Sequence, residues 1–208
     1  RELGIVLIFD EVVTGFRLAP GGAQEYYGVV PDLAAYGKAL ASGLPLGAYG
    51  GRADLMECVS ELRLGDEQYA WSASTTGGNP VSCAAALATL DVLQQPGVYD
   101  QLHELGRRFR SLMRQALEDT GVAGTILGDG PLAQMAFSDQ PVLDQTSWLQ
   151  SDRQRGRAVM LELFKHGIFL NPMSTKLYVS LAHDESALQV FTQRLVTALN
   201  KTNPLVCA

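Results

Sequence analysis

The apolar run near the start of the chain constrains the fold most. Gly4–Phe9 is apolar at every position and rich in branched side chains, and it ends at Asp10. A continuous run of this kind, without alternation, is typical of a strand buried on both faces of a parallel sheet covered by helices. The sequence therefore predicts an α/β fold with Asp10 at the carboxyl end of a strand, where open sheets of this class bind their ligands.

Further short strands and four helices are expected along the chain. Asn79 and Pro80 suit the N-cap and the first position of a helix. Gly167 favours the end of another helix, and Asp184 favours the start of the last one. The expected helices are 81–94, 98–120, 151–165 and 185–200, and the expected strands are 4–9, 31–36, a short one around Tyr49, 124–127, 133–137, 168–170 and 177–180.

The pattern changes to short strands and turns after the long helix, so we expect a domain boundary near residue 121. Residues 1–120 would belong to a large domain, 121–203 to a small C-terminal domain and 204–208 to a tail. The chain opens on Arg1, and a buried-looking strand starts almost at once. We therefore expect it to be the C-terminal part of a longer protein.

The composition argues against several functions. With 16 basic and 22 acidic residues, the net charge is −6, which does not favour a nucleic-acid surface. The three cysteines and three histidines show no metal-ligand spacing, so no metal is expected. No apolar run approaches the roughly 18 residues that span a membrane, and no signal peptide is recognisable. A cytoplasmic protein without nucleic-acid or membrane partners is expected.

Three places in the chain could together carry chemistry. Asp10 ends the first strand, and Lys38 ends the next one among small and apolar residues, where a lysine loses proton affinity and can attack a carbonyl. Ser74 and Thr75 precede the helix opened by Asn79, where hydroxyls, amides and the helix dipole favour an anion. Taken alone, Asp10 could also be a solvated loop acid, Lys38 a surface charge, and the segment with Ser74 and Thr75 a plain capping loop. Together they match the needs of pyridoxal phosphate (PLP): a lysine for its aldehyde, a carboxylate for its ring nitrogen and a phosphate cradle.

The same segments resemble the motifs of class III aminotransferases. Asp10–Arg17 is similar to the strand-end motif, in which the aspartate binds the pyridine nitrogen and the residue two later, here Val12, packs on the cofactor ring. Pro31–Leu33, Gly37–Lys38 and Gly43–Gly51 resemble the segment of the cofactor lysine, and Ser74–Pro80 resembles the segment whose threonine reaches the phosphate in the partner subunit. The resemblance implies that Lys38 is catalytic and that Asp10, Val12, Lys38, Ser74 and Thr75 bind the cofactor.

The resemblance also implies the fold and the assembly. The family has the PLP-dependent transferase fold type I, so this chain is expected to hold part of the large domain, with its mostly parallel sheet, and a small α+β C-terminal domain. A homodimer with active sites shared between subunits, acting on a small-molecule amino or keto substrate, is implied as well.

Within the family, Ala23–Asp32 and Ser180–His183 are most similar to the glutamate-1-semialdehyde 2,1-aminomutases. This implies conversion of glutamate 1-semialdehyde to 5-aminolevulinate, in porphyrin biosynthesis. The sequence departs from the aminomutases at two places: Ser74 stands where they usually have glycine, and Met173–Lys176 lacks their acidic residue. The charge reversal at the second place, near the active-site entrance, argues for a different substrate. An aminotransferase domain of a polyketide or non-ribosomal peptide assembly line, acting on a β-keto acyl chain, and a degenerate non-catalytic module are the alternatives.

Overall fold

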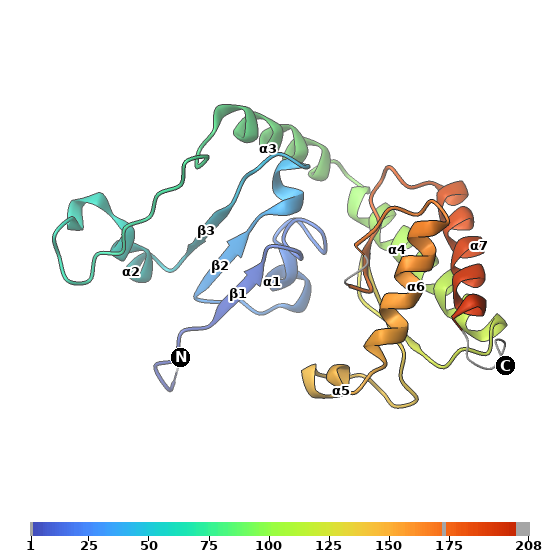
Figure 1. Ribbon diagram of the computed structural model, residues 1–208. Helices are drawn as coiled ribbons and strands as arrows, with labels where there is room; N and C mark the ends of the chain where they lie inside the picture. Colours follow the sequence, from blue (N-terminus) through green and yellow to red (C-terminus); the bar gives the residue numbers. More distant parts are fainter. Residues whose placement is uncertain (1, 172–173, 203–208) are drawn as a thin grey trace. The chain divides into compact units, whose positions relative to one another are not determined.

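The computed structural model describes residues 2–171 and 174–202. Contacts divide the chain into two compact units, Arg1–Tyr99 and Asp100–Ala208 (Figure 1). Pro172, Met173 and the expected tail 204–208 lie outside the described residues. No helix in the described ranges combines the length and apolar character needed to cross a membrane.

The first unit contains a mixed three-stranded sheet in the order β1-β2-β3. β1 (Ile8–Glu11) runs parallel to β2 (Leu33–Tyr36), and β2 pairs antiparallel with β3 (Ala48–Gly51). The short helix α1 (Gly22–Tyr27) lies in the connection between the two parallel strands (Figure 1). The predicted α/β class and the strands at 31–36 and around Tyr49 are confirmed.

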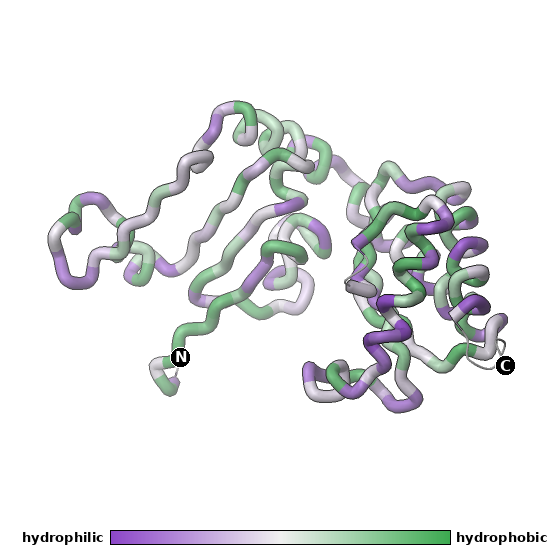
Figure 2. The backbone as a smooth tube through the Cα atoms, viewed as in Figure 1, coloured by the Kyte–Doolittle hydropathy of each residue, from purple (hydrophilic) through white to green (hydrophobic). Residues whose placement is uncertain are grey.

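The apolar run forms a strand later than expected. β1 begins at Ile8 and continues through Glu11, although the run itself covers residues 4–9, seen as the green stretch that leads into β1 (Figure 2). The prediction that this strand is buried on both faces is wrong for the described chain, because Ile5 and Ile8 are 66% and 62% exposed. The rest of the described chain therefore leaves apolar surface uncovered along this strand.

The helix α3 and several short helical segments complete the first unit. The predicted helix after Asn79 is confirmed as α3 (Pro80–Leu93), and the Asn79 side chain accepts hydrogen bonds from the backbone N–H groups of Val81 and Ser82. The remaining segments are the 3₁₀ helix Lys38–Ala41, the helix α2 (Ala53–Met56) and the 3₁₀ turns Glu57–Val59 and Glu61–Arg63.

The second unit packs helices on an antiparallel sheet. Its strands are β4 (Thr125–Leu127), β5 (Leu132–Ala136) and β6 (Lys176–Tyr178), in the order β4-β5-β6. Its helices are α4 (Val98–Asp119), α5 (Gln145–Leu149), α6 (Arg153–Lys165) and α7 (Glu185–Lys201). One apolar core joins sheet and helices through fully buried side chains such as Met113, Met135, Leu163 and Leu195.

The predicted ends of two helices are confirmed. Gly167, with φ +82°, follows the end of α6, and the Asp184 carboxylate accepts a hydrogen bond from the Ala187 N–H at the start of α7. The predicted strand at 168–170 is wrong. The Ile168 N–H bonds the Leu163 carbonyl, so the chain there closes the last turn of α6 instead of joining the sheet.

The long helix α4 provides much of the second core. Phe109, Met113, Ala116 and Leu117 of α4 pack against the strands and helices that follow. The boundary between the compact units accordingly lies at Tyr99–Asp100, near the start of α4, whereas the domain boundary expected near residue 121 lies beyond its end. The domain limits 1–120, 121–203 and 204–208 stay a prediction.

Candidate functional site

The two residues with the most specific sequence signal lie at one edge of the first sheet. Asp10 is near the carboxyl end of β1, and Lys38 follows the end of β2 after Gly37. Because β1 and β2 are parallel neighbours, with Asp10 opposite Ala35, both strands end at the same edge. Both side chains are exposed. A ligand at this edge can therefore contact an acid and a primary amine.

Val12 belongs to the same group. The Asp10 carboxylate accepts a hydrogen bond of 3.1 Å from the Val12 backbone N–H, which turns the chain at the strand end. A Cβ atom on Gly37 would lie 3.5 Å from Val12 Cγ1, an ordinary van der Waals distance. Val12 therefore lies next to the backbone that precedes Lys38, and the structure brings Asp10, Val12 and Lys38 together.

The backbone of Lys38 has an uncommon conformation. Its φ of +44° is in the left-handed region, which residues other than glycine rarely adopt. Such conformations persist where surrounding packing holds them, and they cluster at functional sites. Here Leu40 and Ala41 of the 3₁₀ helix pack against Ala86 of α3, which fixes the segment that begins at Lys38.

Glu11, which the sequence reasoning missed, anchors this edge from inside. Its side chain is only 1% exposed. One carboxylate oxygen accepts hydrogen bonds from the Thr14 hydroxyl (2.8 Å) and the Ala23 N–H (2.7 Å), and the other accepts from the Gln24 N–H (2.9 Å). A Cβ atom on Gly22 would lie 2.3 Å from a Glu11 carboxylate oxygen. The carboxylate thus ties the end of β1 to the start of α1.

Tyr36 connects α1 to the lysine segment. The Gln24 side-chain amide donates a 2.6 Å hydrogen bond to the Tyr36 hydroxyl, and the Tyr36 ring lies 5.5 Å from the Phe16 ring. Burial raises the pKa of Tyr36, the Gln24 hydrogen bond lowers it, and the nearby Glu11 carboxylate adds to the rise. Because Tyr36 is two residues before Lys38, these contacts hold the strand end from which the lysine projects.

Asp32 has a structural role that the sequence reasoning did not assign. Its side chain is 2% exposed. One carboxylate oxygen accepts a hydrogen bond from the Leu7 N–H (2.9 Å), and the other is paired with the Arg52 guanidinium (3.0 Å). Asp32 therefore joins the chain before β1 to the chain after β3. Asp32 is the only acidic residue of the Pro31–Leu33 motif.

Ser74 and Thr75 are not brought to the edge formed by Asp10 and Lys38. Both are exposed in the loop before α3, where the Ser74 hydroxyl accepts a hydrogen bond from the Thr76 N–H. Within the ranges that the structure describes, neither residue is hydrogen bonded to Asp10 or Lys38. Their predicted contact with a phosphate in a partner subunit stays a prediction. No cluster of three potential metal-ligating side chains occurs among the described residues either.

Comparison with known proteins places the chain in a family. The family model for class III aminotransferases matches residues 1–199. A glutamate-1-semialdehyde 2,1-aminomutase from Pelotomaculum thermopropionicum is 41% identical over 187 residues, which are 89% of this chain and 42% of that protein.

Solved structures agree with this placement. The crystal structure of an omega-transaminase from Sphaerobacter thermophilus is 32% identical, with a TM-score of 0.81, over 97% of this chain and 45% of that one. A structure described as a transaminase with PLP bound is 25% identical, with a TM-score of 0.80, over 99% of this chain and 46% of that one.

The fold is therefore that of the α/β, fold type I transaminases that use PLP. The chain belongs to the class III aminotransferase family, whose cofactor is pyridoxal 5′-phosphate. It spans less than half the length of the curated relatives that it matches, 42% and 47% of two of them.

Proposed function

We propose that this chain is part of a PLP-dependent enzyme that moves an amino group on a small amino or keto substrate. The observation that carries the proposal is the placement of Asp10 and Lys38 at one edge of a parallel strand pair. The residues at this edge fit the cofactor: the Val12 N–H holds the carboxylate, and Gly37 has no side chain next to the lysine. Family membership supports the same chemistry.

Each residue at the edge has a role in this proposal. When bound, PLP draws the electron pair of a substrate C–H bond into its ring. The Asp10 carboxylate would keep the proton on the ring nitrogen, and Val12 would pack on the ring. Lys38 Nζ would hold the aldehyde carbon and then act as the base that takes the substrate proton. Ser74 and Thr75 would bind the phosphate across the interface of a homodimer.

For the reaction itself, we propose conversion of glutamate 1-semialdehyde to 5-aminolevulinate, a step of porphyrin biosynthesis in the cytoplasm. The curated relatives that carry the aminomutase name support it. Amino transfer with a separate donor is the second candidate. It is favoured by the similarity to an omega-transaminase and by the absence of an acid in Ser174–Lys176.

Substrate tests separate the two reactions. The protein that carries this chain is given glutamate 1-semialdehyde with no second amino donor, and 5-aminolevulinate is measured. Product supports the aminomutase. If product forms from a keto substrate only after an amino donor is added, the second candidate is supported instead.

Labelling tests the role of Lys38. The holoenzyme is reduced with borohydride and digested, and the peptide that carries the pyridoxyl group is identified by mass spectrometry. The label is expected on Lys38 and is expected to be lost in Lys38→Ala, while Lys165→Ala, a change of an exposed lysine in α6, keeps it. A label on any other lysine contradicts the proposal.

A further inference from the structure

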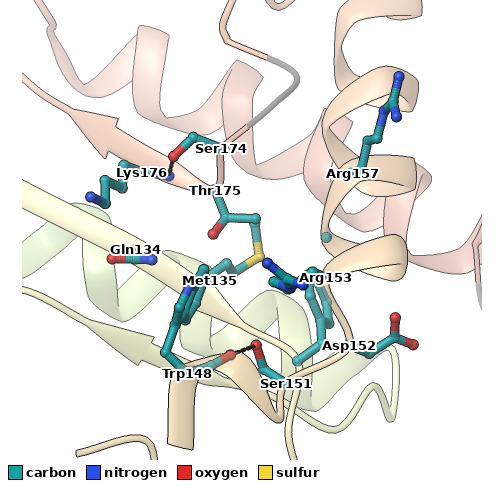
Figure 3. Close-up of a pocket in the computed structure, with 12 residues that line it drawn as sticks. Gln134, Met135, Trp148, Ser151, Asp152, Arg153, Arg157, Ser174, Thr175 and Lys176 are labelled. Carbon is teal, nitrogen blue, oxygen red and sulfur yellow. Dashed lines mark hydrogen bonds between the residues drawn. The ribbon is translucent and has the colours of Figure 1, made fainter. Parts of the chain in front are cut away.

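A pocket in the second unit has features of a ligand site. It has a volume of about 240 Å³ and lies between β5, the start of β6 and the N-terminal turn of α6 (Figure 3). This volume is below the usual range for small-molecule sites, which is roughly 300–1,000 Å³. It therefore suits a small organic molecule better than a nucleotide.

The Thr175 hydroxyl is the first sign of an occupant. Thr175 is 7% exposed, and its hydroxyl oxygen is buried without a hydrogen-bond partner in the part of the chain that the structure describes. Figure 3 shows this oxygen directed into the pocket, towards Gln134 and Met135. Because an unpartnered buried hydroxyl is unfavourable, an acceptor atom placed in the pocket would satisfy it.

The position of this hydroxyl is held by close packing. A Cβ atom on Gly156 of α6 would lie 3.0 Å from Thr175 Cγ2, so the helix and the strand segment are in tight contact. The Thr175 carbonyl also accepts a hydrogen bond from the Met135 N–H, at 3.3 Å. The hydroxyl is therefore presented on rigid structure.

Unpaired positive charge surrounds the pocket. Arg153, Arg157 and Lys176 line it, and across residues 2–171 and 174–202 none of the three forms an ion pair. The acid among the lining residues, Asp152, caps α6 by accepting a hydrogen bond from the Arg155 N–H, and Figure 3 shows its carboxylate directed away from Thr175. The pocket therefore favours an anion.

The three cations differ in position. In Figure 3 the guanidinium of Arg153 lies beside Met135, whereas Arg157 and Lys176 extend outward from the rim. All three side chains are exposed, so a change of rotamer can bring the outer two onto an occupant. Arg153 is also the first residue of α6, where the helix dipole adds to the positive field.

Apolar side chains also line the pocket. Met135 is fully buried and Phe137 is 4% exposed. The half-buried Trp148 lies next to Met135 in Figure 3. We propose that this pocket binds a small organic anion, with its oxygens at Arg153 and the Thr175 hydroxyl and its apolar part against Trp148. This inference does not depend on the proposed amino-transfer chemistry.

Trp148 allows a direct binding test. Trp71 is the other tryptophan of the chain, so Trp71→Phe leaves Trp148 as the reporter of the pocket. The full chain is titrated with hexanoate, with inorganic phosphate and with sodium chloride at matched ionic strength. Saturable changes in Trp148 fluorescence with hexanoate, and none with chloride, are expected. Saturation with phosphate but not hexanoate would replace the organic anion by an inorganic one and overturn the apolar part of the proposal.

Two substitutions test the assigned contacts. In the Trp71→Phe background, Arg153→Gln and Thr175→Val are each expected to weaken hexanoate binding by about tenfold or more, because each removes a hydrogen bond to a charged group. Arg107→Gln, which changes an exposed arginine of α4 paired with Glu104, is the matched control and should leave binding unchanged. Circular dichroism checks that each variant is folded.

A purely structural role of the Thr175 hydroxyl predicts a different result for Thr175→Val. If the hydroxyl is only a packing feature, Thr175→Val raises the thermal midpoint and leaves the hexanoate affinity unchanged. That result, or equal weakening by Arg107→Gln and Arg153→Gln, would overturn the proposal. An increase of the thermal midpoint with hexanoate that is lost in Thr175→Val supports it.

Discussion

The side-chain amide of Gln24 donates a 2.6 Å hydrogen bond to the hydroxyl of Tyr36. Gln24 is in α1 and Tyr36 ends β2, so this bond links the helix to the strand that leads to Lys38. Glu11 binds the backbone of the same glutamine. The edge with Asp10 and Lys38 is therefore supported by the buried Glu11 carboxylate, the Gln24 amide and the Tyr36 hydroxyl.

The Gln24–Tyr36 bond predicts the effect of Tyr36→Phe. The change removes an acceptor from a partly buried amide, so a loss of about 1 kcal/mol in the free energy of unfolding is expected. Urea denaturation measures it. Tyr69→Phe is the control, because the Tyr69 hydroxyl has no hydrogen bond within the described chain. Equal effects of the two changes would show that the Gln24 bond contributes nothing.

Glu11→Gln should be more harmful. The carboxylate accepts three hydrogen bonds, and an amide in its place would turn an NH₂ group towards donors that need an acceptor. A loss of roughly 3 kcal/mol or more in the free energy of unfolding is expected, since hydrogen bonds to charged groups are each worth about 1.5–3 kcal/mol. Urea denaturation of Glu67→Gln, at an exposed site, gives the reference. A Glu11→Gln midpoint equal to this reference would exclude the anchoring role.

Tyr99 predicts a change of stability at alkaline pH. Its hydroxyl donates to the Phe16 carbonyl at 3.2 Å, and burial, with a smaller contribution from Glu25, raises the pKa of Tyr99 to about 12. The unfolded chain ionises this phenol near pH 10 and the folded chain only near pH 12, so stability falls as the pH rises through this window.

The measurement for Tyr99 is the urea midpoint between pH 9 and about pH 12. Tyr99→Phe cannot ionise at this position, so its midpoint is expected to fall less steeply than that of the unchanged chain. The control is again Tyr69→Phe, which should keep the original slope. An identical slope in Tyr99→Phe would mean that other groups cause the alkaline loss.

Local sequence signals predicted a good part of this structure. Asn79 and Asp184 cap α3 and α7 because their side chains bind N–H groups within three residues, which makes the signal readable in one short segment. Asp10 and Lys38 were recognisable because each ends an apolar strand, and parallel strands end at the same edge.

The contacts that support the site could not be read in the same way. Glu11 bonds with residues 12 and 13 positions away, and Asp32 pairs with Arg52 at a distance of 20 positions. Such pairings depend on how the chain folds back, and the composition of either segment does not specify them. The apolar residues 168–170 misled for a different reason: the bond from the Ile168 N–H to the Leu163 carbonyl is local, but a short apolar run does not distinguish a strand from the end of a helix.

Two opposing effects determine how Gly106→Ala in α4 changes the stability of the chain. Replacing a glycine inside a helix by alanine normally stabilises it by about 1 kcal/mol. Here, however, a Cβ atom would lie 1.8 Å from the Gly130 carbonyl oxygen, which is backbone and is also held by the Arg110 guanidinium. Because overpacking of a rigid contact costs about 1–3 kcal/mol or more, Gly106→Ala is expected to destabilise the chain by roughly 2 kcal/mol in urea denaturation. Ser111→Ala, at an exposed position of the same helix, should change the free energy of unfolding by less than about 0.5 kcal/mol. A more stable Gly106→Ala would show that α4 and the turn at Gly130 are not in close contact.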